Sequence, residues 1–195
     1  MSPAPTLVLA STSAYRRELL TRLGLPFEVQ APGVEEWPVA GELPMDRALR
    51  LALEKALAVA ARQPQALVIG SDQVAACQGR VLDKPGDAAR AFSQLAFLSA
   101  QRAHFYTACA VVGAGLPLPL VHLDTTTVTL RPLSTAEIER YVAREQPFDC
   151  AGSFKAEALG VTLFESIESI DPTALIGLPL IWLAGALRAA GFLLP

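Results

Sequence analysis

The segment Leu67–Gln73, with the sequence LVIGSDQ, constrains the fold of this chain more than any other stretch. It begins with three large apolar residues, two of them β-branched, which is typical of a strand buried on both faces of a sheet. Such strands belong to α/β folds, where ligands bind at the carboxyl ends of central strands. We therefore expect Gly70 and Ser71 to leave the sheet and Asp72 to lie at its carboxyl end. Both a catalytic aspartate and a turn aspartate that caps the next segment are compatible with this position.

The composition indicates how the chain is organised and which kinds of ligand it can bind. The chain has 195 residues, of which 52% are hydrophobic and 18% are charged. This predicts one ordered domain over residues 1–195 with a substantial core. The formal net charge is −3, and no long run of Lys or Arg is present. A duplex nucleic acid or a membrane surface is therefore not an expected partner, whereas a small anionic ligand held by a few placed cations is.

The cysteines and the first residues of the chain indicate in which cellular compartment the protein is expected. The three cysteines, Cys77, Cys109 and Cys150, are odd in number and form no C-x-x-C pair. This pattern argues against a disulfide framework and against a zinc site, and reduced thiols in a cytoplasmic protein are the expectation. Residues 1–5 lack the basic region of a signal peptide. The longest apolar runs, near 108–121 and 175–187, contain proline and are shorter than the roughly 20 residues of a helical membrane span.

A strand–turn–helix unit is predicted at the start of the chain. Residues 6–10 read as a short buried strand, and Ser13 is a suitable N-cap for a helix over 14–23. Hydroxyl and backbone N–H groups at a helix start attract phosphate. Arg16 lies in the first turn, where a cation opposes the helix dipole. It therefore indicates an anion nearby, unless its side chain simply faces water.

The remaining elements place further candidate residues. Strands are expected over 27–29, 104–112, 120–130 and 161–164, and helices over 45–62, 88–98, 134–145 and 180–190. Lys55 lies within the apolar sequence of the helix over 45–62, and Lys84 precedes a proline that favours extended backbone. Glu35 and Glu36 form an acidic pair in a loop, which either faces water or binds a hard cation through oxygen.

Two histidines fall on the predicted strands. His104 and His122 are each the lone histidine of their predicted strand. An isolated histidine on a strand is more often structural than catalytic. We therefore assign neither histidine a role in the chemistry.

The motifs in their order resemble the Maf (septum-formation-inhibitor-like) nucleotide pyrophosphatases over nearly the whole chain. The matching pieces are LASTSAYRR at 9–17, EKA at 54–56, GSDQV at 70–74, KP at 84–85, CAGSFK at 150–155 and GLPL at 177–180. The resemblance implies an α/β fold of the Maf/inosine-triphosphatase-like type, with a mixed twisted sheet flanked by helices and a deep cleft between two lobes. It also implies a homodimer.

Three residues resemble the subgroup that hydrolyses 7-methyl-GTP: Tyr15, Gln73 and Glu157. The dTTP/UTP subgroup would usually have Arg, Thr and Gln at these positions. Methylation at N7 places a positive charge on guanine, and an aromatic ring such as that of Tyr15 attracts a stacked cation by about 0.5–2 kcal/mol. Glu157 can accept charge-assisted hydrogen bonds from the guanine N1–H and amino groups.

The resemblance also implies the reaction and its residues. A nucleoside triphosphate is cleaved between the α- and β-phosphates, giving the monophosphate and pyrophosphate. Asp72 is the candidate general base, or else a metal ligand that orients the attacking water. Mg²⁺ or Mn²⁺ is expected, with Glu36 as a second ligand beside Asp72. The expected phosphate-binding residues are Ser11, Ser13, Arg16, Lys55 and Lys84.

Two rival functions remain open at this point. The chain could be a nucleotide-binding regulator of cell division without important turnover, or a scaffold that binds partners. Asp72, Lys55 and Lys84 favour the enzyme, because a scaffold gains little from ionisable groups beside apolar segments.

Overall fold

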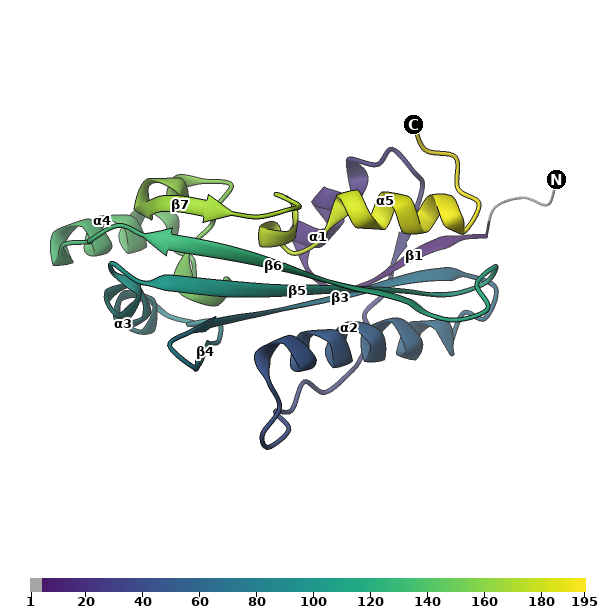
Figure 1. Ribbon diagram of the computed structural model, residues 1–195, viewed down its shortest axis with the longest axis horizontal. Helices are drawn as coiled ribbons and strands as arrows, with labels where there is room; N and C mark the ends of the chain where they lie inside the picture. The colour runs from purple at the N-terminus through teal and green to yellow at the C-terminus, as the bar shows by residue number, and fades with distance from the viewer. Residues whose placement is uncertain (1–4) are drawn as a thin grey trace. The chain divides into compact units, whose positions relative to one another are not determined.

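The computed structural model describes residues 5–195, which form a mixed α/β arrangement (Figure 1). The strands are β1 (Leu7–Ala10), β2 (Glu28–Val29), β3 (Leu67–Cys77), β4 (Arg80–Leu82), β5 (Arg102–Gly113), β6 (Leu120–Leu130) and β7 (Phe164–Glu168). The α-helices are α1 (Ala14–Thr21), α2 (Pro44–Ala60), α3 (Ala88–Leu98), α4 (Thr135–Glu145) and α5 (Leu180–Ala189). Short 3₁₀ turns are η1 (Ala151–Ser153), η2 (Leu159–Leu163) and η3 (Ala174–Ile176).

The strands form a mixed sheet of seven strands. Their order is β2-β1-β3-β5-β6-β7, and β4 pairs with β3. Strand β1 runs parallel to both β2 and β3, with Ala10 opposite Gly70 at the end of the parallel pairing. Strands β4 and β7 are antiparallel to β3 and β6, respectively. The α/β class with a mixed sheet and flanking helices is thus confirmed.

The described chain divides into two compact units. The first comprises the residues up to Gln73 together with Thr107–Asp124 and Asp171–Pro195, and the second comprises Val74–Tyr106 and Thr125–Ile170. Strands β3, β5 and β6 each contribute residues to both units. The single domain over 1–195 and the cleft implied by the resemblance stay predictions.

The first unit packs helices on both faces of its strands (Figure 1). Alternate residues of a strand point to opposite faces, and Leu9 and Ile69 lie in a buried cluster with Leu20 of α1 and Leu183 of α5. Helix α2 covers the opposite face, where its small residues approach Gly70. A Cβ added at Gly70 would lie only 2.7 Å from the Ala56 nitrogen, so this strand position has room for glycine alone.

The second unit has an aromatic centre and a well-capped helix. The Phe154 ring lies 5.2 Å from that of Phe105 and 4.7 Å from that of Phe164, measured between centroids. Helix α4 begins with a complete capping box between Ser134 and Glu137. Hydrogen bonds from the Ser134 N–H and hydroxyl and from the Arg131 guanidinium lower the pKa of Glu137 to about 2.

Several predicted elements match the structure, and two details were wrong. Ser13 is the N-cap of α1, as expected. Strand β3, however, continues to Cys77, so Ser71 and Asp72 stay within the strand instead of following its end. The parallel pairing with β1 nevertheless ends at Gly70, so Asp72 lies just beyond the carboxyl end of that pair.

The predicted strand over 161–164 is also wrong. Residues 161–163 belong to η2, and the strand of this region is β7, which begins at Phe164. The physical reason lies at Gly160, which packs directly on the Lys155 backbone and turns the chain before it can extend. In the range 5–195, no helix is both long and apolar enough to span a membrane.

Candidate active site

Asp72 forms a buried ion pair with Lys55. Asp72 lies on β3 two residues after Gly70 and therefore on the strand face that meets α2. Its Oδ1 is 2.6 Å from Nζ of Lys55, a residue of α2 that is only 4% exposed. A buried charge requires such a partner, because its desolvation is otherwise very costly. The approach of α2 to Gly70 thus brings a carboxylate and an ammonium from distant sequence positions together.

Glu36 adds a second carboxylate to this pair. Its Oε1 is also 2.6 Å from Lys55 Nζ, and its side chain is 52% exposed. The oxygens of Asp72 and Glu36 are therefore separated by no more than twice that distance. The two residues predicted as metal ligands thus lie close together, and both contact the ammonium group of Lys55.

The residue types at this point fit a magnesium-like ion. Across residues 5–195, no three His, Cys, Asp or Glu side chains are grouped so that they could hold a metal by themselves. Mg²⁺, however, is commonly held by one or two carboxylates, with water and substrate phosphates completing its ligands. Asp72 and Glu36 supply oxygens of that kind and in that number.

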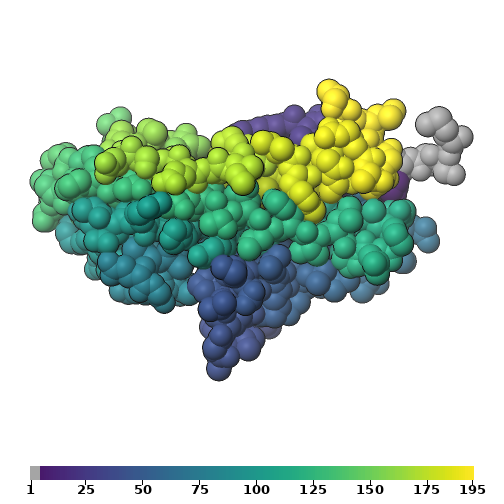
Figure 2. Space-filling model, in the orientation of Figure 1, coloured from purple at the N-terminus to yellow at the C-terminus, as the bar shows by residue number. Residues whose placement is uncertain are grey.

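Arginines of α2 hold the loop that carries Glu36. Arg47 donates to the Glu36 carbonyl at 3.3 Å, and Arg50 donates to the Trp37 carbonyl at 3.3 Å. Arg50 also forms a two-pronged ion pair with Glu42, at 2.6 and 2.7 Å. In Figure 2 the loop between β2 and α2, drawn in dark blue, stands out from the surface at the bottom of the view. The contacts to α2 compensate for the lack of regular secondary structure between β2 and α2.

Arg16 lies at the start of α1 and is bound to the distant residue Gly177. Its Nε donates to the Gly177 carbonyl at 3.0 Å. Burial lowers the pKa of Arg16, while the negative charges of Asp72 and Glu36 act in the opposite direction. An arginine in proteins keeps its charge in either case. The anions that the sequence indicated near Arg16 thus include the carboxylates of two other segments.

The two serines before α1 organise the helix start. The Ser13 hydroxyl accepts a bond from the Arg16 N–H at 3.4 Å, and the Ser11 hydroxyl accepts one from the Ser13 N–H at 3.1 Å. Ser11 is buried and Ser13 is half-buried. Tyr15, in the first turn of α1, is also half-buried. These residues lie together with Arg16 at one helix N-terminus, the type of site that favours phosphate.

Gln73 and Ser71 point away from the α2 face, toward the chain before α5. The Gln73 amide donates to the Ala174 and Leu175 carbonyls at 3.1 and 3.0 Å and to the Thr107 hydroxyl at 2.9 Å. The Ser71 hydroxyl lies 2.9 Å from the Gly177 carbonyl oxygen. Sequence reasoning missed Thr107 and the role of Gly177. The GLP motif at 177–179, which is part of the resemblance, was the signal in the sequence that could have identified Gly177.

The other two predicted site residues belong to the second unit. Lys84 follows β4, and Glu157 precedes η2; both are exposed. Near Glu157, the Lys155 ammonium lies 3.4 Å from Glu145 in a half-buried ion pair. The phosphate-binding role of Lys84 and the base-binding role of Glu157 stay predictions.

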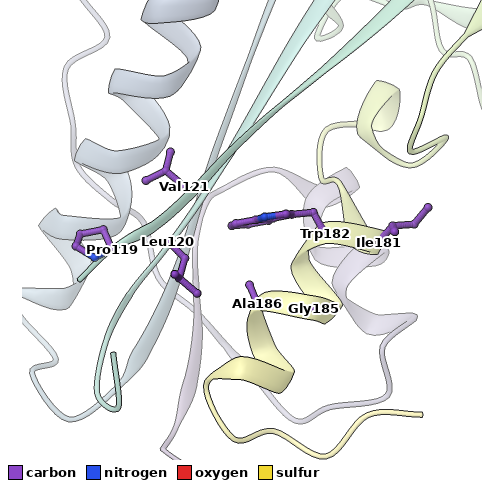
Figure 3. A pocket seen from close by; sticks show the side chains of 7 residues that line it. All are labelled: Pro119, Leu120, Val121, Ile181, Trp182, Gly185 and Ala186. Atoms are coloured by element: carbon purple, nitrogen blue, oxygen red, sulfur yellow. The ribbon is translucent and has the colours of Figure 1, made fainter. Parts of the chain in front are cut away.

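A separate cavity of about 580 Å³ lies between α5 and the chain around the start of β6 (Figure 3). Its lining consists of Pro119, Leu120, Val121, Ile181, Trp182, Gly185 and Ala186. Figure 3 shows the Trp182 ring directed across this space. None of these seven residues carries a charged group, so the lining does not suit a polyphosphate. The Trp182 ring also stacks on His122, at 5.0 Å between centroids, which agrees with a structural role for that histidine.

Comparison with known proteins matches residues 6–190 to the family model described as Maf-like protein. The chain belongs to the Maf family. It is 56% identical to the 7-methyl-GTP pyrophosphatase of Xanthomonas oryzae pv. oryzae (strain MAFF 311018), over 98% of this chain and 100% of that relative. It is also 56% identical to the 7-methyl-GTP pyrophosphatase of Aromatoleum aromaticum, with 97% of each chain covered.

Other matches of this Maf-family protein are more distant. The 7-methyl-GTP pyrophosphatase of Thiobacillus denitrificans is 52% identical, over 96% of this chain and 94% of that relative. Among solved structures, the Staphylococcus aureus Ham1 protein has 17% identity and a TM-score of 0.46, with 64% of this chain and 71% of that chain covered.

Proposed function

We propose that this protein hydrolyses 7-methyl-GTP to 7-methyl-GMP and pyrophosphate. The observation that carries the proposal is the convergence of Asp72 and Glu36 on Lys55, next to the charged helix start at Arg16. Relatives that are more than half identical over nearly the whole chain carry the name 7-methyl-GTP pyrophosphatase. The family and the site chemistry support a nucleotide pyrophosphatase, and the names of these relatives support 7-methyl-GTP as its substrate.

The reaction breaks one phosphoanhydride bond. The oxygen of a water molecule forms a new bond to phosphorus, while the bond between the bridging oxygen and the α-phosphorus breaks. The electron pair of that bond leaves with the bridging oxygen as part of pyrophosphate. We assign to Asp72 the role of accepting a proton from the water or of orienting it; the 2.6 Å ion pair with Lys55, which holds the carboxylate in place, supports this role.

Positive groups stabilise the charge that develops on the phosphates. Arg16 and the N-terminus of α1 supply such charge in the first unit, and we assign the same role to Lys84 of the second unit. Asp72 and Glu36 would hold Mg²⁺ or Mn²⁺, which neutralises phosphate oxygens and acidifies water when bound. Lys55 keeps the two carboxylates close together, so their geometry is organised in advance.

The proposed base contacts come from Tyr15, Gln73 and Glu157. A tyrosine ring attracts a stacked cationic base, and a glutamate accepts hydrogen bonds from the guanine edge. The Gln73 amide nitrogen is directed toward the turn η3 by its three acceptors, so its contribution to a ligand comes from its carbonyl oxygen. A cytoplasmic location and a homodimer are part of the same proposal.

A screen for pyrophosphate release tests the function. We expect the purified protein with Mg²⁺ to act on 7-methyl-GTP in preference to GTP, dTTP and UTP, and to lose activity with EDTA. Asp72→Asn should lower kcat at least about a hundredfold, because it removes the base or metal ligand. Its melting temperature should show that the variant stays folded.

Each alternative function has its own outcome in the same screen. Preference for dTTP and UTP would assign the chain to the other subgroup. Tight binding of triphosphates without pyrophosphate release would favour a nucleotide-binding regulator. A melting temperature that responds to neither nucleotide nor Mg²⁺ would favour a scaffold. Full activity of Asp72→Asn would remove this residue from the mechanism.

A further inference from the structure

The segment before α5 is held by a buried polar clasp, formed by Asp171 and Thr173. Asp171 is only 2% exposed. Its Oδ1 accepts hydrogen bonds from the Thr173 N–H at 2.9 Å and from the Thr173 hydroxyl at 2.6 Å. Its Oδ2 accepts from the Ile181 N–H at 2.7 Å, and the Thr173 hydroxyl accepts from the Leu180 N–H at 2.9 Å. The clasp thus closes a loop whose ends are residues 171–173 and 180–181.

Gly177 lies within this closed loop, and its carbonyl contacts Arg16 of the proposed site and Ser71 of β3. It accepts the Arg16 Nε–H at 3.0 Å and lies 2.9 Å from the hydroxyl of Ser71, the residue directly before Asp72. A second set of contacts, from Gln73 and Thr107 to the carbonyls at 174–175, fixes the middle of the loop. The position of the Gly177 carbonyl is therefore determined by the contacts at 174–175 and by the Asp171–Thr173 clasp.

We propose that Asp171 and Thr173 are positioning residues, which set the Arg16 guanidinium for phosphate through the Gly177 carbonyl. A guanidinium has five N–H donors in one plane. Holding the Nε–H on the Gly177 carbonyl restrains the guanidinium and leaves its two Nη groups to bind an anion in a two-pronged manner. This inference rests on the proposed function, because it takes the bound anion to be the substrate's polyphosphate.

The position of Gly177 explains why a glycine serves this purpose. Its φ of +127° is strained for residues with a side chain. A glycine can therefore present its carbonyl to the guanidinium without backbone strain. If the clasp served stability alone, the effect of its mutation on anion binding would be the same with and without Arg16. The experiment tests this difference.

The test replaces Thr173 by valine, which has nearly the same volume but no hydroxyl. We expect KM for 7-methyl-GTP and the Kd for inorganic tripolyphosphate to rise together, about tenfold, because small displacements of a binding group are costly. The kcat value should change by less than about twofold, since the bound substrate still meets Asp72. Thr173→Ser keeps the hydroxyl and should restore both constants.

A double-mutant cycle distinguishes positioning from stability. In an Arg16→Met background, Thr173→Val should weaken tripolyphosphate binding no further, because its effect passes through Arg16. Thr126→Val is the matched control: it removes a buried hydroxyl in the second unit, bonded to Ser169 at 3.0 Å, and should leave KM and Kd unchanged. If Thr173→Val does not fold, Asp171→Asn takes its place in the cycle.

The outcomes are decisive for the positioning role. Independent, multiplicative effects of Arg16→Met and Thr173→Val would overturn it, and so would equal behaviour of Thr173→Val and Thr126→Val. Absence of tripolyphosphate binding to the unmodified protein would overturn it too. If the unmodified protein binds tripolyphosphate in an Arg16- and Thr173-dependent manner but releases no pyrophosphate, the positioning role stands and the proposed function fails.

Discussion

Lys55 places one positive charge between two carboxylates, those of Asp72 and Glu36. Both N–O distances are 2.6 Å, but the surroundings of the two acids differ: Asp72 is buried, whereas about half of the Glu36 side chain is exposed. Removing one partner of a buried pair leaves an uncompensated charge, which is more costly than the pair itself is stabilising. Lys55 therefore serves both as the partner of the buried Asp72 carboxylate and as the group that keeps the two carboxylates close.

Replacement of Lys55 by methionine tests this arrangement. Lys55→Met should lower the free energy of unfolding by about 3 kcal/mol, measured by urea denaturation, because Asp72 stays buried without its cation. Millimolar Mg²⁺ should then raise the melting temperature of this variant more than that of the unmodified protein, since the ion replaces the missing charge between two oxygen ligands.

A lysine of the second unit provides the control for this change. Lys155 is half-buried and pairs with the single carboxylate of Glu145 at 3.4 Å. Lys155→Met should gain no such response to Mg²⁺, because only one carboxylate is left behind. Equal responses of the two variants would show that Asp72 and Glu36 do not form a cation site.

At the level of elements, the site depends on how closely α2 approaches β3. The small residues Ala52 and Ala56 of α2 flank Lys55 in sequence and pack against Gly70, which lies on the same strand face as Asp72. A larger residue at any of these contacts would increase the distance between helix and strand. The ion pair between Lys55 and Asp72 thus depends on three small residues, which allow α2 to approach β3 closely.

Gly70→Ala tests this close approach. The added Cβ would lie 2.7 Å from the Ala56 nitrogen, so helix and strand must separate. We expect a loss of about 3 kcal/mol in the free energy of unfolding and a marked fall in pyrophosphate release. Gly185→Ala in α5 is the control, because its Cβ would meet no atom within 4 Å, and it should stabilise the protein by about 0.5–1 kcal/mol. A neutral effect of Gly70→Ala would contradict the packing argument.

At the level of the whole molecule, two compact units share three strands. Strands β3, β5 and β6 each give residues to both units. Loss of order in one unit would therefore disrupt strands of the other, and cooperative unfolding requires contacts of this kind. Both tryptophans, Trp37 and Trp182, belong to the first unit, so their fluorescence reports on that unit alone.

We predict a single unfolding transition in urea. Tryptophan emission, which follows the first unit, and far-UV circular dichroism, which follows both, should give the same midpoint and the same slope. Two steps in the circular dichroism, with only one of them matched by tryptophan emission, would show instead that the chain contains two independently folding domains.

Local patterns in the sequence were sufficient for most of the elements. The apolar run at 67–69 predicted a buried strand and Ser13 predicted a helix start; both are confirmed. These features depend on interactions within a few residues of chain. The end of β3 and the 3₁₀ turn at 159–163 were missed, because partner strands and the packing of Gly160 on Lys155 decide them.

By itself, the sequence determined which residue types were available for the site: two carboxylates, one lysine in an apolar helix and one arginine at a helix start. Only the tertiary structure decided that Lys55 contacts both acids and that Arg16 is held by the Gly177 carbonyl. These contacts join residues that are 17 to 161 positions apart. No local pattern encodes such distances, because they are set by how strands align and how closely helices pack against them.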